Sequence, residues 1–328
     1  MCTQQTPRHR AEVISVPPCL CVSQSVQPLD NERACTDLST RTRAPRFVPP
    51  PARMPSPLTA LLALGAALAL ASCDLPAAQV PAVPVNPLRA EPAAPAAKPA
   101  MAGKFRVAYH AVDDTTYARW QNDFRDARFL EDVAEWLNGW IALPHDVTIG
   151  FDRCGAPNAY YHPETRSVSL CFELVENLDA ALAAEGDEEG AQAVSDALLF
   201  TTLHEVGHAL VDVLDIPIAG REEDAVDQLA AVMLVDGSDE GSEAAVNGAA
   251  GLATDEEELD DLAFADEHAL GSQRFYNVLC LVYGQDPEGY ADWVSDGTLP
   301  GERAAGCEEE YAHVSRSWDR LLEPYLKD

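Results

Sequence analysis

His204-Glu205-Val206-Gly207-His208 decides the fold of this chain, because two histidines four residues apart lie on one face of an α-helix and can reach one metal ion. The glutamate after the first histidine points to the open side of such a metal, where a water molecule binds. Zinc lowers the pKa of that water to about 7, and a carboxylate beside it can accept the proton. The motif therefore predicts a zinc site with Glu205 as the general base.

The residues on both sides of the motif carry no charge. Residues 197–203 precede it and residues 209–211 follow it, which predicts a helix buried on nearly all sides. Two histidines and a glutamate inside such a helix are costly unless a metal ion or hydrogen-bond partners satisfy them. Gly207 weakens the helix, so we expect it to make room for a closely packed neighbour. A buried helix with two hydrogen-bonded histidines and no metal is the alternative.

The third metal ligand has to come from another segment. A third histidine on an extension of the motif is excluded, because Val211 and Leu214 occupy the positions that this pattern requires to be glycine and histidine. Proline and glycine break the chain at 215–220, and a second helix is expected over 221–234. After so short a turn we expect the two helices to be antiparallel neighbours, which brings early carboxylates of the second helix back to the histidines.

Glu223 and Asp227 lie four residues apart on the expected second helix. With His204, Glu205 and His208 they resemble the gluzincin peptidases, in which a glutamate is the third ligand and an aspartate one turn later orients a ligand histidine. More specifically, the chain resembles a bacterial metallopeptidase family. The residues behind this resemblance are the histidine motif, residues 221–230, Glu267-His268 and Gln273-Arg274-Phe275-Tyr276. It covers most of residues 104–328, and it implies a zincin-like fold but no particular substrate.

Two registers compete for the third ligand. Glu223 as ligand fits the gluzincin spacing, with Asp227 orienting a histidine from behind. Asp224 as ligand would resemble the aspartate-ligand zinc peptidases instead. The remaining carboxylates, including Glu222, then either fix a histidine tautomer or form a charged first helical turn that the helix dipole favours.

Peptide hydrolysis also needs a hydrogen-bond donor for the oxyanion, and gluzincins usually supply it from a downstream tyrosine or histidine. Three candidates lie in the segment that belongs to the resemblance: His268, Arg274 and Tyr276. We expect His268 and Tyr276 to be the catalytic candidates. A purely structural role is the alternative for a single histidine.

The pattern of apolar residues predicts an α+β fold, in which a small sheet lies beside the motif helix and the C-terminal part is mostly helical. Strands are expected at 105–109, 147–151 and 167–172, and one long amphipathic helix at 114–141. Residues 160–165 are interpreted as a turn that leads into the third strand. By resemblance to zincins, the 167–172 strand lines the cleft and pairs with substrate, and an interior strand is the alternative.

Two acidic runs, 236–243 and 255–261, follow the second helix. They are interpreted as solvated loops. Calcium binding is the alternative, but neither run has the aspartate spacing of a dedicated calcium loop.

A targeting segment precedes the domain. Residues 54–73 predict a lipoprotein signal peptide, since residues 58–70 form an apolar run too short to span a membrane. The run ends in Leu70-Ala71-Ser72-Cys73, which resembles the bacterial lipoprotein cleavage box with Cys73 as the lipidated residue. We therefore expect a lipid-anchored protein of the bacterial cell envelope, facing the periplasm or the cell exterior. Simple secretion is the alternative.

The rest of the chain divides by composition. Residues 1–53 lack periodic hydrophobicity and are interpreted as a gene-model extension or disordered leader, with translation beginning at Met54. Residues 74–103 are mainly alanine and proline and predict an extended tether. Residues 104–328 are enough for one domain with a sizeable core.

Five cysteines lie at or after position 73, and lipidation of Cys73 leaves four for disulfides in an oxidising compartment. Four cysteines allow three pairings, which the sequence alone does not distinguish. Proximity favours Cys154–Cys171 and Cys280–Cys307. A zinc site made of these cysteines is not expected, because no C-x-x-C spacing is present.

The chain has 54 acidic and 22 basic residues and a formal charge of −32, which argues against nucleic acid as a partner. The expected partners are a peptide or protein substrate and, through the lipid on Cys73, a membrane. The expected function is zinc-dependent hydrolysis of peptide bonds. The alternatives are an inactive zincin-fold binding lipoprotein and a structural zinc domain, which would need a fourth protein ligand that is not evident near the motif.

Overall fold

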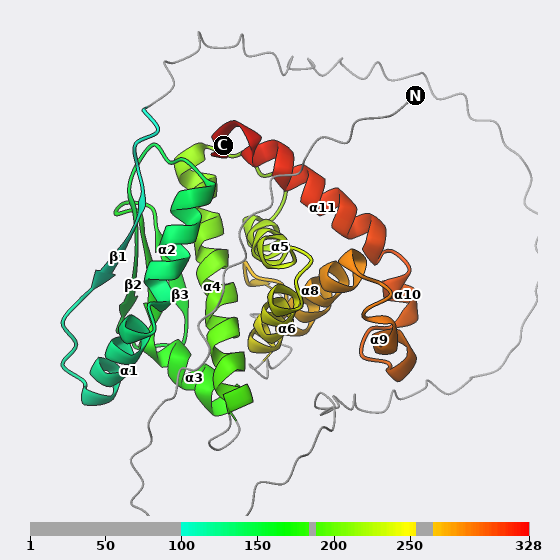
Figure 1. Cartoon of the computed structure of the whole chain (residues 1–328), viewed down its shortest axis with the longest axis horizontal. Coiled ribbons are helices and arrows are strands. Elements are labelled where there is room, and N and C mark those ends of the chain that lie inside the picture. Colours follow the sequence, from blue (N-terminus) through cyan, green and yellow to red (C-terminus); the bar gives the residue numbers. More distant parts are fainter. Residues whose placement is uncertain (1–99, 184–187, 254–264, 328) are drawn as a thin grey trace, which may run out of the picture. The chain divides into compact units, whose positions relative to one another are not determined.

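The computed structural model describes residues 100–183, 188–253 and 265–327. The predicted signal peptide, Cys73, most of the tether and the acidic run at 255–261 lie outside the described residues. Within them, a small mixed sheet is followed by a mostly helical C-terminal part (Figure 1), which confirms the α+β prediction.

Four strands form the sheet, in the order β1-β2-β4-β3. Their bounds are β1 Phe105–Tyr109, β2 Val147–Asp152, β3 Ala159–His162 and β4 Ser167–Cys171. β2 pairs with β1 and with β4 in parallel, and β3 pairs with β4 antiparallel. The three predicted strands are therefore present. The prediction that 167–172 lines the cleft is wrong, because β4 is interior and β3 forms that edge of the described sheet.

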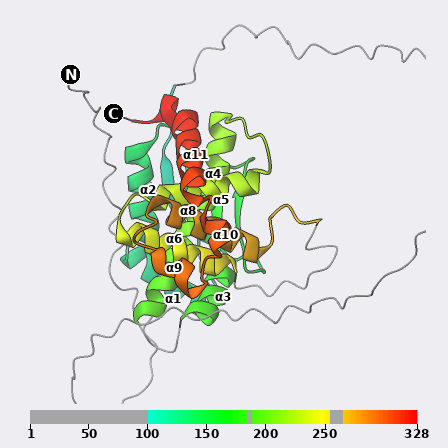
Figure 2. The same cartoon turned by 90° about the vertical axis from the view of Figure 1, so that its right-hand side faces the viewer.

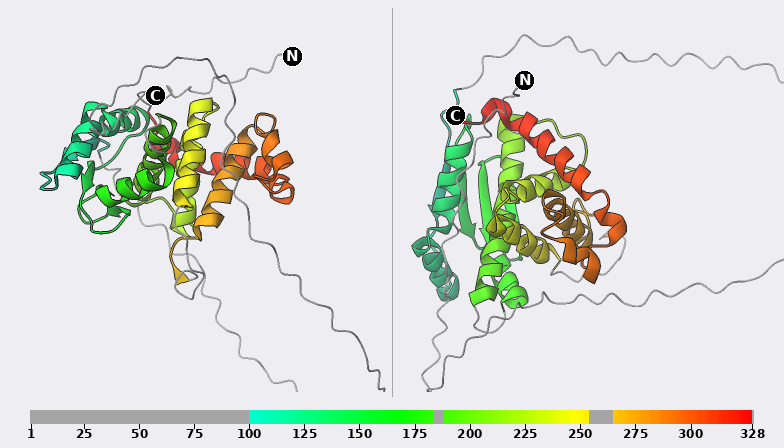
Figure 3. Two further views of the ribbon diagram at one scale, coloured as in Figure 1. Left: turned by 90° about the horizontal axis from the view of Figure 1, so that it is seen from below. Right: turned by 45° about the vertical axis from the view of Figure 1, so that its right-hand side comes forward.

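The predicted helix at 114–141 is instead two helices, α1 Thr115–Asp126 and α2 Phe129–Trp140. Arg128 separates them in the left-handed conformation, with φ of 59°. They cover one face of the sheet, whereas α4 (Glu188–Leu214) lies on the other (Figure 3). α3 (Phe172–Leu182) connects β4 towards α4 and packs against both.

Helix α4 is the central element of the core. Residues Glu189–Leu214 are long and apolar enough to cross a membrane, with a mean hydropathy of 1.3, but 78% of that window is buried inside the fold. α4 is therefore a core helix. It packs on the sheet side against β3 and β4, and on its other side against α5 (Glu222–Leu234) and α6 (Asp239–Leu252).

α5 crosses α4 at a steep angle. In Figure 1, α4 runs up the picture while α5 is seen nearly end-on, so the expected antiparallel pairing is wrong. The prediction for Gly207 is confirmed, because a Cβ there would lie 2.8 Å from Cβ of Val226. Asp215 has φ of 52° and Pro217 follows it, so the connection turns sharply before α5 begins. This crossing places the first turn of α5 beside the histidine motif.

The acidic run at 236–243, which was predicted to be a solvated loop, contains the start of helix α6. Ser238 caps α6, and its hydroxyl accepts a hydrogen bond from the backbone N–H of Gly241. Asp239 and Glu240 then lie in the first helical turn, where the helix dipole favours negative charge. Most of the run at 236–243 is therefore helix and not a loop.

The C-terminal helices complete the fold. They are α8 Gly271–Gln285, α9 Ala291–Asp296, α10 Gly301–Ala304 and α11 Cys307–Leu322, followed by the short 3-10 helix η1 Glu323–Tyr325. α11 packs on α8 and on α5 (Figure 2). The Tyr325 hydroxyl donates a hydrogen bond to the carbonyl of Leu214, at 3.1 Å, which ties the C-terminal end of the domain to the end of α4.

The described part of the chain contains two disulfides, Cys154–Cys171 and Cys280–Cys307, which is the pairing that proximity favours. The first joins the segment after β2 to the end of β4, and the second joins α8 to the start of α11. The first disulfide stabilises the two inner strands of the sheet, and the second stabilises the helical half of the domain.

Candidate metal centre

Helix α4 presents His204 and His208 on one face. Their ring centroids are 5.0 Å apart, and the rings meet edge to face. His204 is 4% exposed, and His208 is partly buried. A core helix thus holds two imidazoles where they can share one metal ion.

Glu223, in the first turn of α5, lies between the two rings. One of its carboxylate oxygens is 3.1 Å from His204 Nε2, and the carboxylate is 3.3 Å from His208 Nε2. One ligand atom from each of the three residues can be chosen so that all three atoms lie within 4.8 Å of one another. His204, His208 and Glu223 form the candidate metal centre.

A second carboxylate holds each histidine from its other side. Asp227 Oδ1 is 2.8 Å from His204 Nδ1, and Glu222 Oε1 is 2.8 Å from His208 Nδ1. Because an ionised carboxylate can only accept, Nδ1 of both rings carries a hydrogen and donates it. In a neutral ring, Nε2 then keeps its lone pair, and this is the tautomer that binds a metal through Nε2.

The candidate metal centre attracts positive charge. Burial opposes protonation of both histidines, but the neighbouring carboxylates outweigh it: they raise the pKa of His204 and raise that of His208 to about 9. Burial likewise opposes ionisation of Glu223, yet its hydrogen bonds to the histidines hold the pKa of this carboxyl well below its usual range. A proton on Nε2 forms these hydrogen bonds to Glu223, and a metal ion would take the place of that proton between Nε2 and the carboxylate oxygens.

Arg274, from α8, binds the carboxylate that holds His204. Its Nε and Nη2 donate to the two carboxylate oxygens of Asp227, each at 2.7 Å. Burial raises the pKa of Asp227, but Arg274 and His204 together lower it to about 2. Arg274 was considered as an oxyanion donor from the sequence, and the structure places its guanidinium on Asp227.

His268 reaches the centre from the segment before α8. Its Nε2 is 2.9 Å from Glu223 Oε2. Asp266 accepts a hydrogen bond from the backbone N–H of His268 at 2.8 Å and lies 3.1 Å from its Nδ1. Arg221, the residue before α5, donates to the carbonyl of His268 at 3.2 Å. The sequence-predicted candidate His268 is therefore brought together with the two histidines of α4.

A cavity of about 450 Å³ opens beside the candidate metal centre. His204, Glu205 and His208 form one wall, and Tyr160 and Tyr161 of the edge strand β3 line another part. Glu205 is 7% exposed, and burial raises the pKa of its carboxyl. Strand β3 and helix α4 thus enclose a space in which a bound molecule meets the histidines and Glu205.

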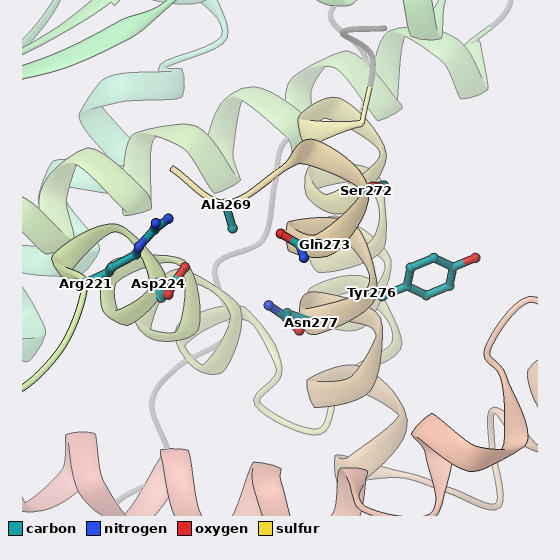
Figure 4. Close-up of a pocket in the computed structure, with 7 residues that line it drawn as sticks. All are labelled: Arg221, Asp224, Ala269, Ser272, Gln273, Tyr276 and Asn277. Carbon is teal, nitrogen blue, oxygen red and sulfur yellow. The ribbon is translucent and has the colours of Figure 1, made fainter. Parts of the chain in front are cut away.

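Asp224 and Tyr276 lie elsewhere, in a second pocket of about 520 Å³ (Figure 4). Figure 4 shows Arg221, just before α5, and Asp224 on α5 opposite Gln273 and Asn277 on α8, with the ring of Tyr276 pointing away from them. Neither Asp224 nor Tyr276 lines the histidine cavity. Of the three downstream donor candidates, His268 alone lines that cavity.

Glu222 contacts His208, which is one of the two roles that the sequence left open for it. Sequence reasoning did not anticipate two further contacts of this region. Tyr161 donates its hydroxyl to Asp212 Oδ2 at 2.6 Å, across 51 residues of sequence. Arg221 reaches the carbonyl of His268 across 47 residues. Nothing in the local sequence indicates either of these two distant contacts.

Comparison with known proteins agrees with this site. A family described as “Putative metallopeptidase” matches residues 109–322, which include every residue of the candidate metal centre. The chain belongs to this family. No curated protein and no solved structure matches the chain. The family implies a metal and a peptide or protein substrate. The structure shows three residues that could hold the metal.

Proposed function

We propose that this protein is a zinc-dependent peptidase with a zincin-like fold. The observation that carries the proposal is the convergence of two imidazole Nε2 atoms on one carboxylate, with Nδ1 of each ring donating to a further carboxylate. Two histidines and one glutamate are a donor set of catalytic zinc sites, which leave one coordination position open. The residues therefore fit the metal that the family implies.

His204, His208 and Glu223 would hold the zinc, with Asp227 and Glu222 orienting the two histidines. The ion would supply a Lewis acid that lowers the pKa of water to about 7 and polarises a carbonyl. Asp224 is not assigned as a ligand, since it lines the second pocket.

Glu205 is assigned as the general base. Its carboxylate lines the cavity next to both histidines, so it can take a proton from the attacking water and pass it to the leaving amine nitrogen. Burial raises the pKa of this carboxyl towards the range in which it can both accept and return a proton.

His268 is assigned as the donor to the oxyanion. Asp266 and Arg221 fix the segment that carries it, and its Nε2 points into the centre. Substrate is expected to lie between β3 and α4, because β3 is an edge strand of the described sheet and offers its free backbone groups to an extended peptide.

We also propose that the domain is held at the bacterial cell envelope by a lipid on Cys73, followed by the alanine- and proline-rich tether. The two disulfides support an oxidising compartment such as the periplasm or the cell exterior. Secretion after cleavage by ordinary signal peptidase is the alternative.

The test is a pair of measurements on the purified chain, wild type and Glu205→Gln: metal content by mass spectrometry, and cleavage of a mixed library of quenched fluorescent peptides. About one zinc per chain in both proteins, with cleavage only by the wild type, is the expected result. Glu189→Gln, an exposed glutamate on the same helix, is the matched control and should cleave like the wild type.

Two other outcomes would contradict the proposal in different ways. One zinc in both proteins with no cleavage in either would favour an inactive zincin-fold binding lipoprotein. No zinc in either protein would refute the metal centre itself.

A further inference from the structure

The cavity beside the candidate metal centre is strongly acidic. Among the described residues that line it are five carboxylates and neither a lysine nor an arginine. Glu205 and Glu223 have roles in the proposed mechanism. The other three are Asp212, Glu222 and Glu267, which are exposed and come from three different segments of the chain.

Asp212 has a fixed place in this cavity. It follows His208 by four residues on α4, so its side chain lies on the same helical face about 6 Å further along the axis. The Tyr161 hydroxyl donates to Asp212 Oδ2 at 2.6 Å, and this contact holds the carboxylate between α4 and the edge strand β3. Oδ1 of Asp212 forms no hydrogen bond within the described part of the chain, so it can accept one from a bound molecule.

The other carboxylates add to the same negative field. Glu222 is bound to His208, and the side chain of Glu267 forms no hydrogen bond with the residues that the structure describes. Like charges gathered in a concave site repel one another more than they do on an open surface, so a cationic group entering the cavity is favoured. Tyr160, which is 38% exposed, and Tyr161 line the same cavity and offer aromatic faces to a cation and to the aliphatic stem of its side chain.

The negative charge belongs to this cavity and is not merely the acidity of the whole chain. In the neighbouring pocket of Figure 4, Arg221 stands near Asp224, and the other lining residues are uncharged. The stretch Glu267 to Ala269 contributes lining residues to both pockets, yet among the described lining residues an arginine is present only in the pocket of Figure 4. A bound molecule with a basic side chain is therefore favoured in the cavity that also contains the histidines.

We propose that the protein selects peptides with a lysine or arginine side chain close to the cleaved bond, and that Asp212 is the main specificity-determining residue, with Glu267 contributing. This inference rests on the proposed function, since it assigns the substrate class of the same site. Tyr161 is a positioning residue that acts through Asp212.

The test compares three quenched fluorescent peptides that differ at one central position: lysine, its uncharged isostere norleucine, or glutamate. The wild type should show a kcat/KM about five- to tenfold higher for lysine than for norleucine, and the lowest value for glutamate. Asp212→Asn should bring the ratio of lysine to norleucine to within about twofold, and Glu267→Gln should lower it less. The wild-type ratio should also fall in 0.5 M salt, where surface charge is screened within about 5 Å.

Asp319→Asn, an exposed aspartate on α11 outside the cavity, removes the same charge from the chain and should leave the ratio unchanged. A binding measurement separates this inference from the proposed function. In the Glu205→Gln background, the dissociation constants of the labelled lysine and norleucine peptides are measured by fluorescence anisotropy, with and without Asp212→Asn.

Each outcome decides the inference. Equal cleavage of lysine and norleucine peptides by the wild type would overturn it while leaving the peptidase intact. If no peptide is cleaved but the lysine peptide binds more tightly and Asp212→Asn abolishes the difference, cation selection stands and the proposed hydrolysis fails. Absence of any preference in both cleavage and binding, or an equal effect of Asp319→Asn, would refute the assignment of Asp212.

Discussion

Two buried carboxylates in this domain have opposite surroundings. Asp227, on α5, is 6% exposed and accepts hydrogen bonds from the Arg274 guanidinium and from His204. Asp196, on α4 eight residues before His204, is 3% exposed, and the described residues that donate to its carboxylate are the amides of Gln192 and Asn247. The pKa of Asp227 is lowered to about 2, whereas burial raises the pKa of Asp196.

The difference separates the surroundings of the candidate metal centre from a part of the core that has no contact with it through hydrogen bonds of the described residues. A cation behind Asp227 keeps that carboxylate ionised, so it can hold His204 in the tautomer that binds a metal. Asp196 has neutral partners only, and ionisation there costs free energy without an evident chemical use. We therefore expect changes around Asp227 to affect both stability and metal binding, and changes at Asp196 to affect stability alone.

The largest effect is expected from Arg274→Met, measured by urea unfolding with metal removed by a chelator. It removes the guanidinium from the buried Asp227 carboxylate and leaves His204 as the remaining partner, which should lower the free energy of unfolding by about 3–5 kcal/mol. Arg303→Met is the matched control, since Arg303 also forms two hydrogen bonds to one carboxylate, that of Glu310, but both side chains are partly exposed. Its loss should stay below about 1 kcal/mol. An equal decrease in the free energy of unfolding of the two variants would contradict the distinction between the buried Arg274–Asp227 pair and the partly exposed Arg303–Glu310 pair.

Much of the site was predictable because its residues are close in sequence. The histidine motif, Glu223 and Asp227 fall on two consecutive helices at four-residue spacings, so a helical periodicity is enough to place them on one side. The resemblance to a family identified His268 as a candidate site residue. In the structure its Nε2 lies next to Glu223. Arg274 was one of three candidates for the oxyanion donor, and the sequence does not show that its guanidinium hydrogen-bonds to Asp227 instead.

The errors have physical causes of two kinds. The edge strand β3 and the contact of Tyr161 with Asp212 depend on pairings between distant segments, which local patterns do not encode. The break between α1 and α2 occurs at Ala127-Arg128, where neither glycine nor proline marks a turn. The start of α6 did carry a signal, Ser238 followed by two acidic residues, and it was overlooked because the acidic run was interpreted as solvated.

A second prediction compares the two carboxylates directly through metal affinity. Asp227→Asn should raise the zinc dissociation constant by about 10- to 100-fold, because the amide no longer stabilises the tautomer and basicity of His204. Asp196→Asn should change that constant by less than about twofold, since the hydrogen bonds of Asp196 with described residues go to Gln192 and Asn247, which do not belong to the metal centre. Competition with a chromophoric chelator measures both constants. A similar loss of affinity in the two variants would mean that the effect is general destabilisation and not orientation of His204.

The smallest effect concerns the pH dependence of stability at Asp196. Burial raises its folded pKa, the amides of Asn247 and Gln192 partly offset this, and repulsion from Glu243 adds to it. The folded state therefore binds this proton more tightly than the unfolded state, whose pKa is about 3.9. The contribution of Asp196 to the free energy of unfolding therefore falls as pH rises from about 3.9 through the raised folded pKa, and it returns when the pH is lowered again.

Asp196→Asn should remove that slope, so the free energy of unfolding of the variant relative to the wild type should increase from pH 4 to pH 7. Asn247 keeps an oxygen acceptor in the variant, because the new side chain has a carbonyl oxygen as well as an amide. Urea unfolding at several pH values, with Asp319→Asn as the exposed control, measures the difference. A relative stability that stays constant across this range would show that Asp196 is not disfavoured when ionised, and the contrast with Asp227 would then rest on metal binding alone.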